Sequence, residues 1–149
     1  MRVILGADHG GFEAKEKVKL WFGETGVDFV DVGDLVPDAD DDYVDFARLA
    51  VETKGTGERV ILFCRNGMGM MIVDKKKRGI RCGLGFGPGA VKKGREDDDI
   101  NALAIPADYC TDEGVKEMIK VFLETEFDDV ERYSSRLKKL ASIEETWLK

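Results

Sequence analysis

Apolar and polar residues alternate along this chain with two different periods. Five short runs rich in β-branched and other apolar residues are each followed by a stretch in which apolar residues recur at helical spacing. Strands that alternate with helices form a parallel sheet with helices on both faces and right-handed crossovers. The pattern predicts an α/β fold, a three-layer doubly wound parallel sheet of about five strands with a Rossmann-like layout. The expected strands are Arg2–Ala7, Val27–Val32, Arg59–Cys64, Ile80–Phe86 and Ala102–Ile105, and the expected helices are Phe12–Phe22, Tyr43–Thr53, Met68–Lys77, Gly89–Glu96 and Asp112–Glu124.

The segment after the last expected helix, Asp129–Lys149, breaks this alternation because it has no strand to follow. A lone domain would leave its apolar stripe exposed to water. We expect residues 1–149 to form one domain in which 129–149 is a C-terminal helical arm that packs on a partner subunit. The apolar residues at helical intervals in this arm are Val130, Tyr133, Leu137, Leu140, Ile143 and Trp147.

Composition indicates an ordinary soluble globular protein and argues against several functions. Of the 149 residues, 43% are hydrophobic and 36% are charged, and the formal net charge is −7. Nucleic acids and anionic membranes require a basic face, so we expect neither as a partner. No apolar run approaches the roughly 18 residues of a membrane span, and the N-terminus lacks a signal-peptide core. Cys64, Cys82 and Cys110 are odd in number and lack zinc-site spacing, which favours reduced thiols in the cytoplasm.

The stretch around Cys64 carries the strongest candidate chemistry. Cys64 ends an apolar strand, and Gly67 and Gly69 follow it just before an expected helix. A thiol can ionise to a thiolate, glycines let a ligand approach backbone N–H groups, and a helix N-terminus favours negative charge. A free cysteine is also often a small buried hydrophobe, and the residues alone leave both interpretations open. Cys82, in mid-strand, is assigned to the core, and Cys110 is given no role.

Other polar residues are expected near Cys64, because open α/β sheets bind ligands beyond the carboxyl ends of their strands. His9 is the only histidine, and its neighbour Asp8 can set its tautomer. The residues assigned to this edge of the sheet are Asp8, His9, Asp42, Tyr43, Cys64 to Gly69, and Asp97 to Asn101.

Three runs of charge have plainer interpretations. The acidic run Asp38–Asp42 is expected to be a solvated loop, and its spacing does not match a calcium-binding loop. The same holds for Asp97–Asp99. Arg132 and Arg136 share a helix face, where they are either solvated or able to clamp a phosphate. No metal or cofactor site is predicted.

Five motifs follow one another in order along nearly the whole chain, from residue 1 to about Arg136. They are Gly6-Ala7-Asp8-His9-Gly10-Gly11-Phe12, Asp42-Tyr43-x-Asp45-Phe46-Ala47, Cys64-x-x-Gly67-x-Gly69-Met70, Gly79-Ile80-Arg81, and Arg95-Glu96-x-x-Asp99-x-Asn101. Together they resemble the type B ribose-5-phosphate isomerases and the galactose-6-phosphate isomerase subunits. The resemblance implies aldose–ketose isomerisation of a sugar phosphate through a cis-enediolate, without metal or cofactor. It also implies a homodimer or dimer of dimers with active sites at the subunit interface.

The resemblance assigns roles to individual residues. Cys64 takes the position of the base that moves a proton between C1 and C2. Asp8 and His9 match the motif that contacts the sugar and assists ring opening, and Arg132 and Arg136 match a pair that reaches the phosphate from a neighbouring subunit. The remaining expected substrate contacts are Tyr43, Asp98, Arg65 and the loop of Asn66, Gly67, Met68 and Gly69, whose backbone N–H groups would hold the enediolate oxygens.

The chain also departs from the family's pattern. Arg65 and Asn66 replace a Gly-Thr pair, and Asp97-Asp98 replaces a His-Asn pair, which leaves His9 or Asp97 to protonate the ring oxygen. Asp108 replaces an arginine that helps to bind phosphate, and a histidine after the first terminal arginine is Tyr133. These changes make the pocket more acidic, and unneutralised carboxylates repel a phosphate dianion.

Three functions are therefore considered. The first is a cytoplasmic sugar-phosphate isomerase in which Arg65 and lysines compensate the acids and Cys64 is the base, its pKa lowered from about 8.5 by the helix N-terminus and Arg65. The second is isomerisation of a different or unphosphorylated sugar, motivated by Asp97, Asp98 and Asp108. The third is a non-catalytic sugar-binding subunit of a hetero-oligomer.

Overall fold

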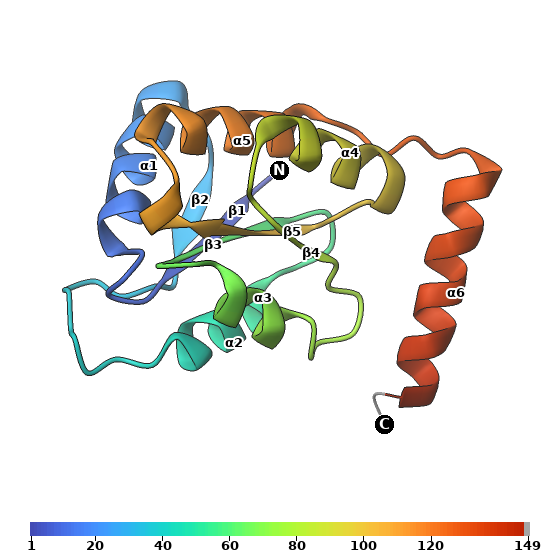
Figure 1. Cartoon of the computed structure of the whole chain (residues 1–149), viewed down its shortest axis with the longest axis horizontal. Coiled ribbons are helices and arrows are strands. Elements are labelled where there is room, and N and C mark those ends of the chain that lie inside the picture. Colours follow the sequence, from blue (N-terminus) through green and yellow to red (C-terminus); the bar gives the residue numbers. More distant parts are fainter. Residues whose placement is uncertain (148–149) are drawn as a thin grey trace.

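A computed structural model describes residues 1–147 of the chain and shows the expected three-layer α/β fold (Figure 1). Five parallel strands form one sheet in the order β2-β1-β3-β5-β4, which confirms the doubly wound class. No helix within the described residues is long and apolar enough to cross a bilayer. The elements are β1 (Val3–Ala7), α1 (Phe12–Thr25), β2 (Phe29–Asp31), α2 (Tyr43–Thr53), β3 (Arg59–Cys64), α3 (Met68–Asp74), β4 (Cys82–Leu84), α4 (Pro88–Asp98), β5 (Ala102–Pro106), a 3-10 turn η1 (Ala107–Tyr109), α5 (Asp112–Glu124) and α6 (Glu131–Trp147).

Helices cover both faces of the sheet and bury its centre. α1, α4 and α5 lie on one face, and α2 and α3 lie on the other (Figure 1). The residues of β1, β3 and β5 are all buried, as expected for parallel strands covered on both sides. Successive side chains of β3 point to opposite faces. Phe63 therefore packs with α1 and α5, whereas Leu62 and Cys64 belong to the apolar cluster beneath α2 and α3.

Several element ends differ from the predicted ones. α1 runs on to Thr25 and stops where Gly26 adopts a φ of 73°, a left-handed conformation that glycine adopts without strain. α3 ends at Asp74, short of Lys77. α4 extends to Asp98, so the acidic residues expected in a loop belong to the last turn of a helix. Hydrophobic spacing locates an element, but capping and strand pairing decide where it ends.

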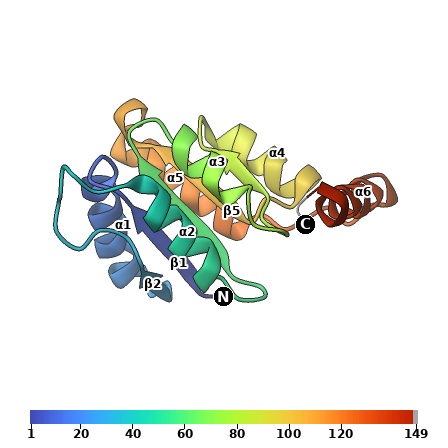
Figure 2. The same cartoon turned by 90° about the horizontal axis from the view of Figure 1, so that it is seen from below.

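Helix α6 stands beside the body of the domain and joins neither layer (Figure 2). A hydrogen bond of 2.9 Å from the Gly79 N–H to the Glu144 carboxylate ties it to the body. Leu140, Ile143 and Trp147 are 45%, 41% and 78% exposed. The predicted C-terminal helix is thus confirmed over Glu131–Trp147, and residues 148 and 149 of the expected arm lie outside the described residues.

Asp74, at the end of α3, is a buried acid that hydrophobic spacing did not predict. Its side chain is fully buried, and neither carboxylate oxygen has a hydrogen-bond partner within residues 1–147. Burial raises the pKa of Asp74 to about 7, and the nearby Cys82 thiol offsets this only in part. The group is therefore neutral in mild acid and charged in an apolar environment in mild base.

We expect the substitution Asp74→Asn to flatten the pH dependence of stability. Because the folded-state pKa lies above the usual value of 3.8, the natural chain loses stability as the pH rises from about 4 to about 7. The amide has nearly the same shape and cannot ionise, so the variant should be the more stable protein at pH 8, with a smaller difference at pH 5. Urea unfolding at both pH values measures this, with the exposed Asp45→Asn as control. An equal difference at both pH values would contradict the expectation.

Candidate active site

Cys64 is the last residue of the central strand β3, on the side of the sheet formed by the carboxyl ends of the strands, and it pairs with Pro106 of β5. The Cys64 sulfur accepts a hydrogen bond of 3.1 Å from the backbone N–H of Gly67. Gly67 has a φ of 74°, a left-handed conformation that turns the chain back over the sulfur before α3 begins. The loop predicted from the Gly67-x-Gly69 spacing thus presents N–H groups to the thiol.

The thiol is more shielded from water than its candidate role led us to expect. Cys64 is 6% exposed, and burial raises its pKa above the usual value. The N–H groups of Gly67, Met70 and Asn66 oppose this effect, whereas the Asp8 carboxylate adds to it. The prediction that the helix end and Arg65 lower the pKa of Cys64 is therefore wrong. Desolvation outweighs the backbone donors, and the Arg65 guanidinium lies 3.5 Å from the Asp108 carboxylate.

Although buried, Cys64 lines a cavity of about 360 Å³ into which polar and charged residues also open. A thiol that only filled the core would be enclosed by apolar groups, so this position distinguishes the two interpretations left open by the sequence. The cavity brings together most of the predicted site: Asp8, His9, Tyr43, Cys64, Arg65, Asn66, Met68 and Gly69.

Tyr43 forms one wall of this cavity, which we call the thiol cavity. The Asp42 side chain accepts the Val44 N–H at 2.9 Å, which caps α2 and starts the helix at Tyr43. A Cβ atom added to Gly69 would lie 2.6 Å from Cε2 of the Tyr43 ring. Only glycine therefore allows the first turn of α3 to pack this closely against the tyrosine.

His9 lies at the end of β1 and is held by Asp41. Its Nδ1 is 2.5 Å from Oδ1 of Asp41, and its backbone N–H donates to Oδ2 at 2.7 Å. The hydrogen bond with Asp41 is the main reason why the pKa of His9 is raised. Asp8 instead accepts the Gly11 N–H at 3.0 Å, and burial raises the pKa of Asp8. The prediction that Asp8 sets the His9 tautomer is wrong, and Asp41, 7% exposed, does not belong to a fully solvated loop.

A second cavity of about 370 Å³ adjoins the thiol cavity and shares His9 and Arg65 with it. We call it the cationic cavity after Arg65 and Lys17, which line it together with three acids, Glu13, Asp108 and Asp112. Each cation already faces an acid: Asp108 lies 3.5 Å from Arg65, and Asp112 lies 2.8 Å from Lys17. These exposed pairs are weak, so an incoming anion can compete with either carboxylate.

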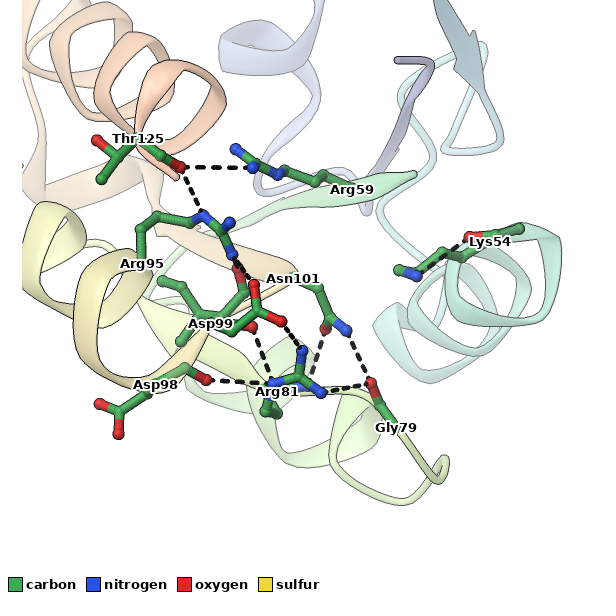
Figure 3. Close-up of polar contacts among 11 residues, drawn as sticks. Lys54, Arg59, Gly79, Arg81, Arg95, Asp98, Asp99, Asn101 and Thr125 are labelled. Carbon is green, nitrogen blue, oxygen red and sulfur yellow. Dashed lines mark hydrogen bonds and ion pairs between the residues drawn. The ribbon is translucent and has the colours of Figure 1, made fainter. Parts of the chain in front are cut away.

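Asp97 and Asp98 lie away from the thiol, on the side of the sheet formed by the amino ends of the strands. They precede β5, and the amino ends of parallel strands lie opposite the carboxyl ends. The turn that follows them is held by Asp99, whose carboxylate lies 2.5 Å from Arg81 and 2.7 Å from Arg95 (Figure 3). The prediction that Asp97 and Asp98 converge with the thiol within one chain is wrong, because they come before a strand instead of after one.

Arg132 and Arg136 line neither the thiol cavity nor the cationic cavity of their own chain. Both are exposed on α6, and the Arg136 guanidinium lies 5.8 Å from the centre of the Tyr133 ring. Within one chain the structure therefore does not bring the two arginines to the predicted site.

A buried, charged cluster around Lys15 of α1 was not predicted from the sequence. Lys15 of α1 is fully buried, and its Nζ lies 2.5 Å from Asp31 Oδ2 and 2.8 Å from the Asp34 carbonyl oxygen. Lysine is almost never fully buried without a partner, and here Asp31 and the Asp34 carbonyl are the partners. The sequence spacing could have indicated this burial, because Lys15 lies three residues from both Phe12 and Val18 on the apolar stripe of α1.

The fold and the cavities define a doubly wound α/β protein with a cysteine-centred polar site at the carboxyl edge of its sheet. A model of the family described as "Ribose/Galactose Isomerase" matches residues 3–140, and the chain belongs to this family. It is 33% identical over 147 residues to "Putative sugar phosphate isomerase YwlF" of Bacillus subtilis, covering 97% of this chain and 98% of that one. It is 31% identical over 154 residues to "4-deoxy-4-sulfo-D-erythrose isomerase" of Clostridium sp., covering 98% and 97%. The structure of ribose-5-phosphate isomerase B from Mycoplasma genitalium with bound ribulose-5-phosphate superposes with a TM-score of 0.91 at 25% identity, covering 97% and 96%.

Proposed function

We propose that this chain is an aldose–ketose isomerase of phosphorylated sugars of the ribose 5-phosphate/ribulose 5-phosphate type. The thiol cavity carries the proposal, because the Cys64 sulfur there meets a backbone N–H donor and shares the cavity with Asp8 and His9. Family membership supports the reaction class. The M. genitalium enzyme, whose structure contains ribulose-5-phosphate, supports the substrate class.

In the proposed reaction Cys64 is the general base that acts on the open-chain sugar. Its thiolate takes the proton from C2 of the aldose, and the electrons of the C2–H bond move into the C1 carbonyl to give a cis-enediolate. Backbone N–H groups of the loop from Asn66 to Gly69 would stabilise the negative oxygen, an effect that is usually the largest in such catalysis. The O2 proton then passes to O1, and the thiol returns its proton to C1, which leaves a ketone at C2.

The raised pKa of Cys64 suits this role in one respect and limits it in another. A thiolate with a higher pKa is a stronger base towards a carbon-bound proton. The higher pKa also means that a smaller fraction of Cys64 is ionised to the thiolate at neutral pH. The rate of the proposed reaction should therefore rise as the pH increases above neutrality.

The cationic cavity is the proposed binding place for the phosphate. Arg65 lies in the loop beside the thiol, and its guanidinium neutralises the negative charge of Asp108 at 3.5 Å. A guanidinium can bind two oxygens of a phosphate at once, and the dianion is a stronger partner than an exposed carboxylate.

The proposal extends to a second copy of the chain, as a homodimer or a dimer of dimers. A groove of about 730 Å³ lies between α6 and the β4–α4 edge, and apolar side chains of Leu84, Phe86, Leu140 and Ile143 line it. A lone chain leaves this groove open to water, which favours cover by a partner. Asp97 and Asp98 also line the groove, so pairing would bring them, with Arg132 and Arg136 of α6, toward the partner's thiol cavity. The free thiols of the chain support a cytoplasmic location.

Two alternatives are supported by specific observations. The acids Asp108 and Asp112 beside the cationic cavity favour a sugar with a smaller negative charge, and the relative from Clostridium sp. is named for a sulfonated tetrose. The open groove is compatible with a different partner chain, in which case this subunit binds sugar without turning it over.

A panel of substrates tests the proposal and separates the alternatives. We expect ketose formation, followed by NMR, from ribose 5-phosphate but not from ribose. Arg65→Ala should lower kcat/KM for the phosphorylated sugar about 10- to 100-fold, the value of one or two charged hydrogen bonds. The exposed Arg48→Ala is the matched control. Preference for 4-deoxy-4-sulfo-erythrose would favour the second function, and binding without turnover would favour the third.

A further inference from the structure

The acidic loop between β2 and α2 is folded so that one of its carboxylates points inward. The Asp34 carboxylate accepts the Asp38 N–H at 3.1 Å, and the Asp38 carboxylate accepts the Asp40 N–H at 3.0 Å. The Asp38 carbonyl then accepts the Asp41 N–H at 3.2 Å. These turns leave Asp40 exposed and carry Asp41 to His9.

Asp41 contacts His9 at two points, which fixes both the position and the orientation of the imidazole. One carboxylate oxygen accepts the backbone N–H, and the other is paired with Nδ1. Because Nδ1 is engaged, Nε2 is the ring nitrogen that can face a ligand in the thiol and cationic cavities, both of which His9 lines. Carboxylates orient catalytic and metal-binding histidines in the same way in other proteins.

We propose that Asp41 is a positioning residue that holds His9 to donate a proton from Nε2 to the ring oxygen of a cyclic sugar phosphate. This inference rests on the proposed isomerase function, which acts only on the open-chain sugar. Asp97 was the other candidate for this proton transfer, and it does not line the thiol cavity of its own chain. An Asp97 supplied by a partner would act without Asp41, so substitution of Asp41 separates the two candidates.

The ring-opening step balances without a further reactant. The bond between C1 and the ring oxygen breaks, and the ring oxygen takes its proton from His9 Nε2. The C1 hydroxyl loses its proton to water and becomes the aldehyde carbonyl on which Cys64 then acts. His9 recovers its proton from water.

The charges around His9 favour the protonated form that this step requires. The hydrogen bond to Asp41 raises the pKa of His9 most, burial lowers it, Asp8 raises it, and Arg65 lowers it, with a net increase. The imidazolium therefore persists to a pH above 6.5, the usual pKa of histidine. Loss of the Asp41 charge should shift the titration of His9 to lower pH. The other titratable groups that line the same two cavities are Glu13, Lys17, Tyr43, Cys64, Asp108 and Asp112.

The distance between the His9 and Asp41 side chains fits a hydrogen bond better than a shared metal ion. Asp8, His9 and Asp41 each offer one ligand atom within 4.8 Å of the others. The separation of 2.5 Å between Nδ1 and Oδ1 is even shorter than the range of about 2.7–2.9 Å for charge-assisted N–H···O hydrogen bonds. Two ligands bonded to one zinc ion at about 2.0–2.2 Å would lie about 3 Å apart or more.

Asp41→Asn tests the inference directly, because an amide keeps a hydrogen-bond acceptor but removes the charge. His9 is the only histidine in the chain, so its ring signals in a ¹H–¹³C NMR titration need no assignment. We expect the His9 titration midpoint to move to lower pH in Asp41→Asn. It should stay in place in Asp40→Asn, the matched control in the same loop. An unchanged midpoint in Asp41→Asn would overturn the inference.

Activity on two substrates separates a positioning role from a merely structural one. A tetrose 4-phosphate cannot close a furanose ring, because its 4-oxygen is esterified, whereas ribose 5-phosphate is mostly cyclic. Asp41→Asn should lower kcat/KM on ribose 5-phosphate at least about tenfold, a part of the roughly 10²–10⁴-fold that general acid catalysis contributes, and leave the tetrose within about twofold. Equal losses on both sugars would overturn the inference. If the natural chain turns over neither sugar, the proposed function fails, and the NMR titration still decides whether Asp41 controls His9.

Discussion

Cys64→Ala should abolish sugar isomerisation while leaving the chain folded and able to bind its ligand. The thiolate is the proposed group that takes the proton from C2, and a positioned base contributes about 10²–10⁴-fold to such a reaction. Alanine keeps the small apolar volume at the end of β3, so the cost in unfolding free energy should be no more than about 1–2 kcal/mol. We expect kcat on ribose 5-phosphate to fall about 10³-fold or more, measured at saturating substrate, with binding by calorimetry retained.

Cys110→Ala is the matched control for this variant. Cys110 lies in a turn after β5, its sulfur is 3.9 Å from the Gly85 carbonyl oxygen, and it lines neither the thiol cavity nor the cationic cavity. Its loss should leave kcat nearly unchanged. Activity of Cys64→Ala at the level of the natural chain would remove Cys64 from the mechanism, and a joint loss of binding and folding would show that its role is structural.

Lys15→Met should be among the most destabilising single substitutions in the chain. It keeps the aliphatic packing but removes the ammonium group that joins Asp31, the Asp34 carbonyl and Glu16. Asp31 is 9% exposed and would keep only Lys19, at 2.7 Å, as a cationic partner. Breaking a buried pair from one side costs about 3–5 kcal/mol, and we expect the lower end of this range because Lys19 remains.

The effect of Lys15→Met should depend on pH in a defined direction. Burial acts to raise the pKa of Asp31, but Lys15 and Lys19 outweigh it, so the net shift is downward. Stability from this ion pair is therefore present above the usual carboxylate pKa and is lost as the pH falls through the lowered value. Urea unfolding at pH 7 should show a larger loss than unfolding at pH 3. The exposed Lys17→Met should cost no more than about 0.5 kcal/mol, and a similar cost for both variants would contradict the assignment.

Much of the architecture could be predicted from local patterns. α2 and α5 begin and end at the predicted residues, and β3 matches its predicted bounds. Each of these elements has a clear hydrophobic period, and α2 and α5 also carry a capping side chain at the start. The thiol and its glycine loop were recognisable for a similar reason, since the strand, the cysteine and the turn lie within a few consecutive residues.

The errors concern residues whose environment depends on distant parts of the chain. Asp41 was expected in a solvated loop because runs of acids usually are solvated. Instead, it forms a hydrogen bond with His9, 32 positions away in the sequence. The pKa of Cys64 was expected to fall, and burial under α2 and α3 raises it. Asp97 was placed near the thiol, although the direction of β5 puts it at the other edge.

The amino-acid sequence alone determined the alternation of strands and helices, the family motifs and the thiol that ends β3, because each is encoded in residues close together along the chain. Only the tertiary structure decided which charged groups meet: Lys15 of α1 with Asp31 of β2, Asp41 with His9 after β1, and Arg65 with Asp108 in the lining of the cationic cavity. The physical reason is that electrostatic and desolvation energies depend on distance through space and on exclusion of water, and neither quantity can be read from separation along the chain.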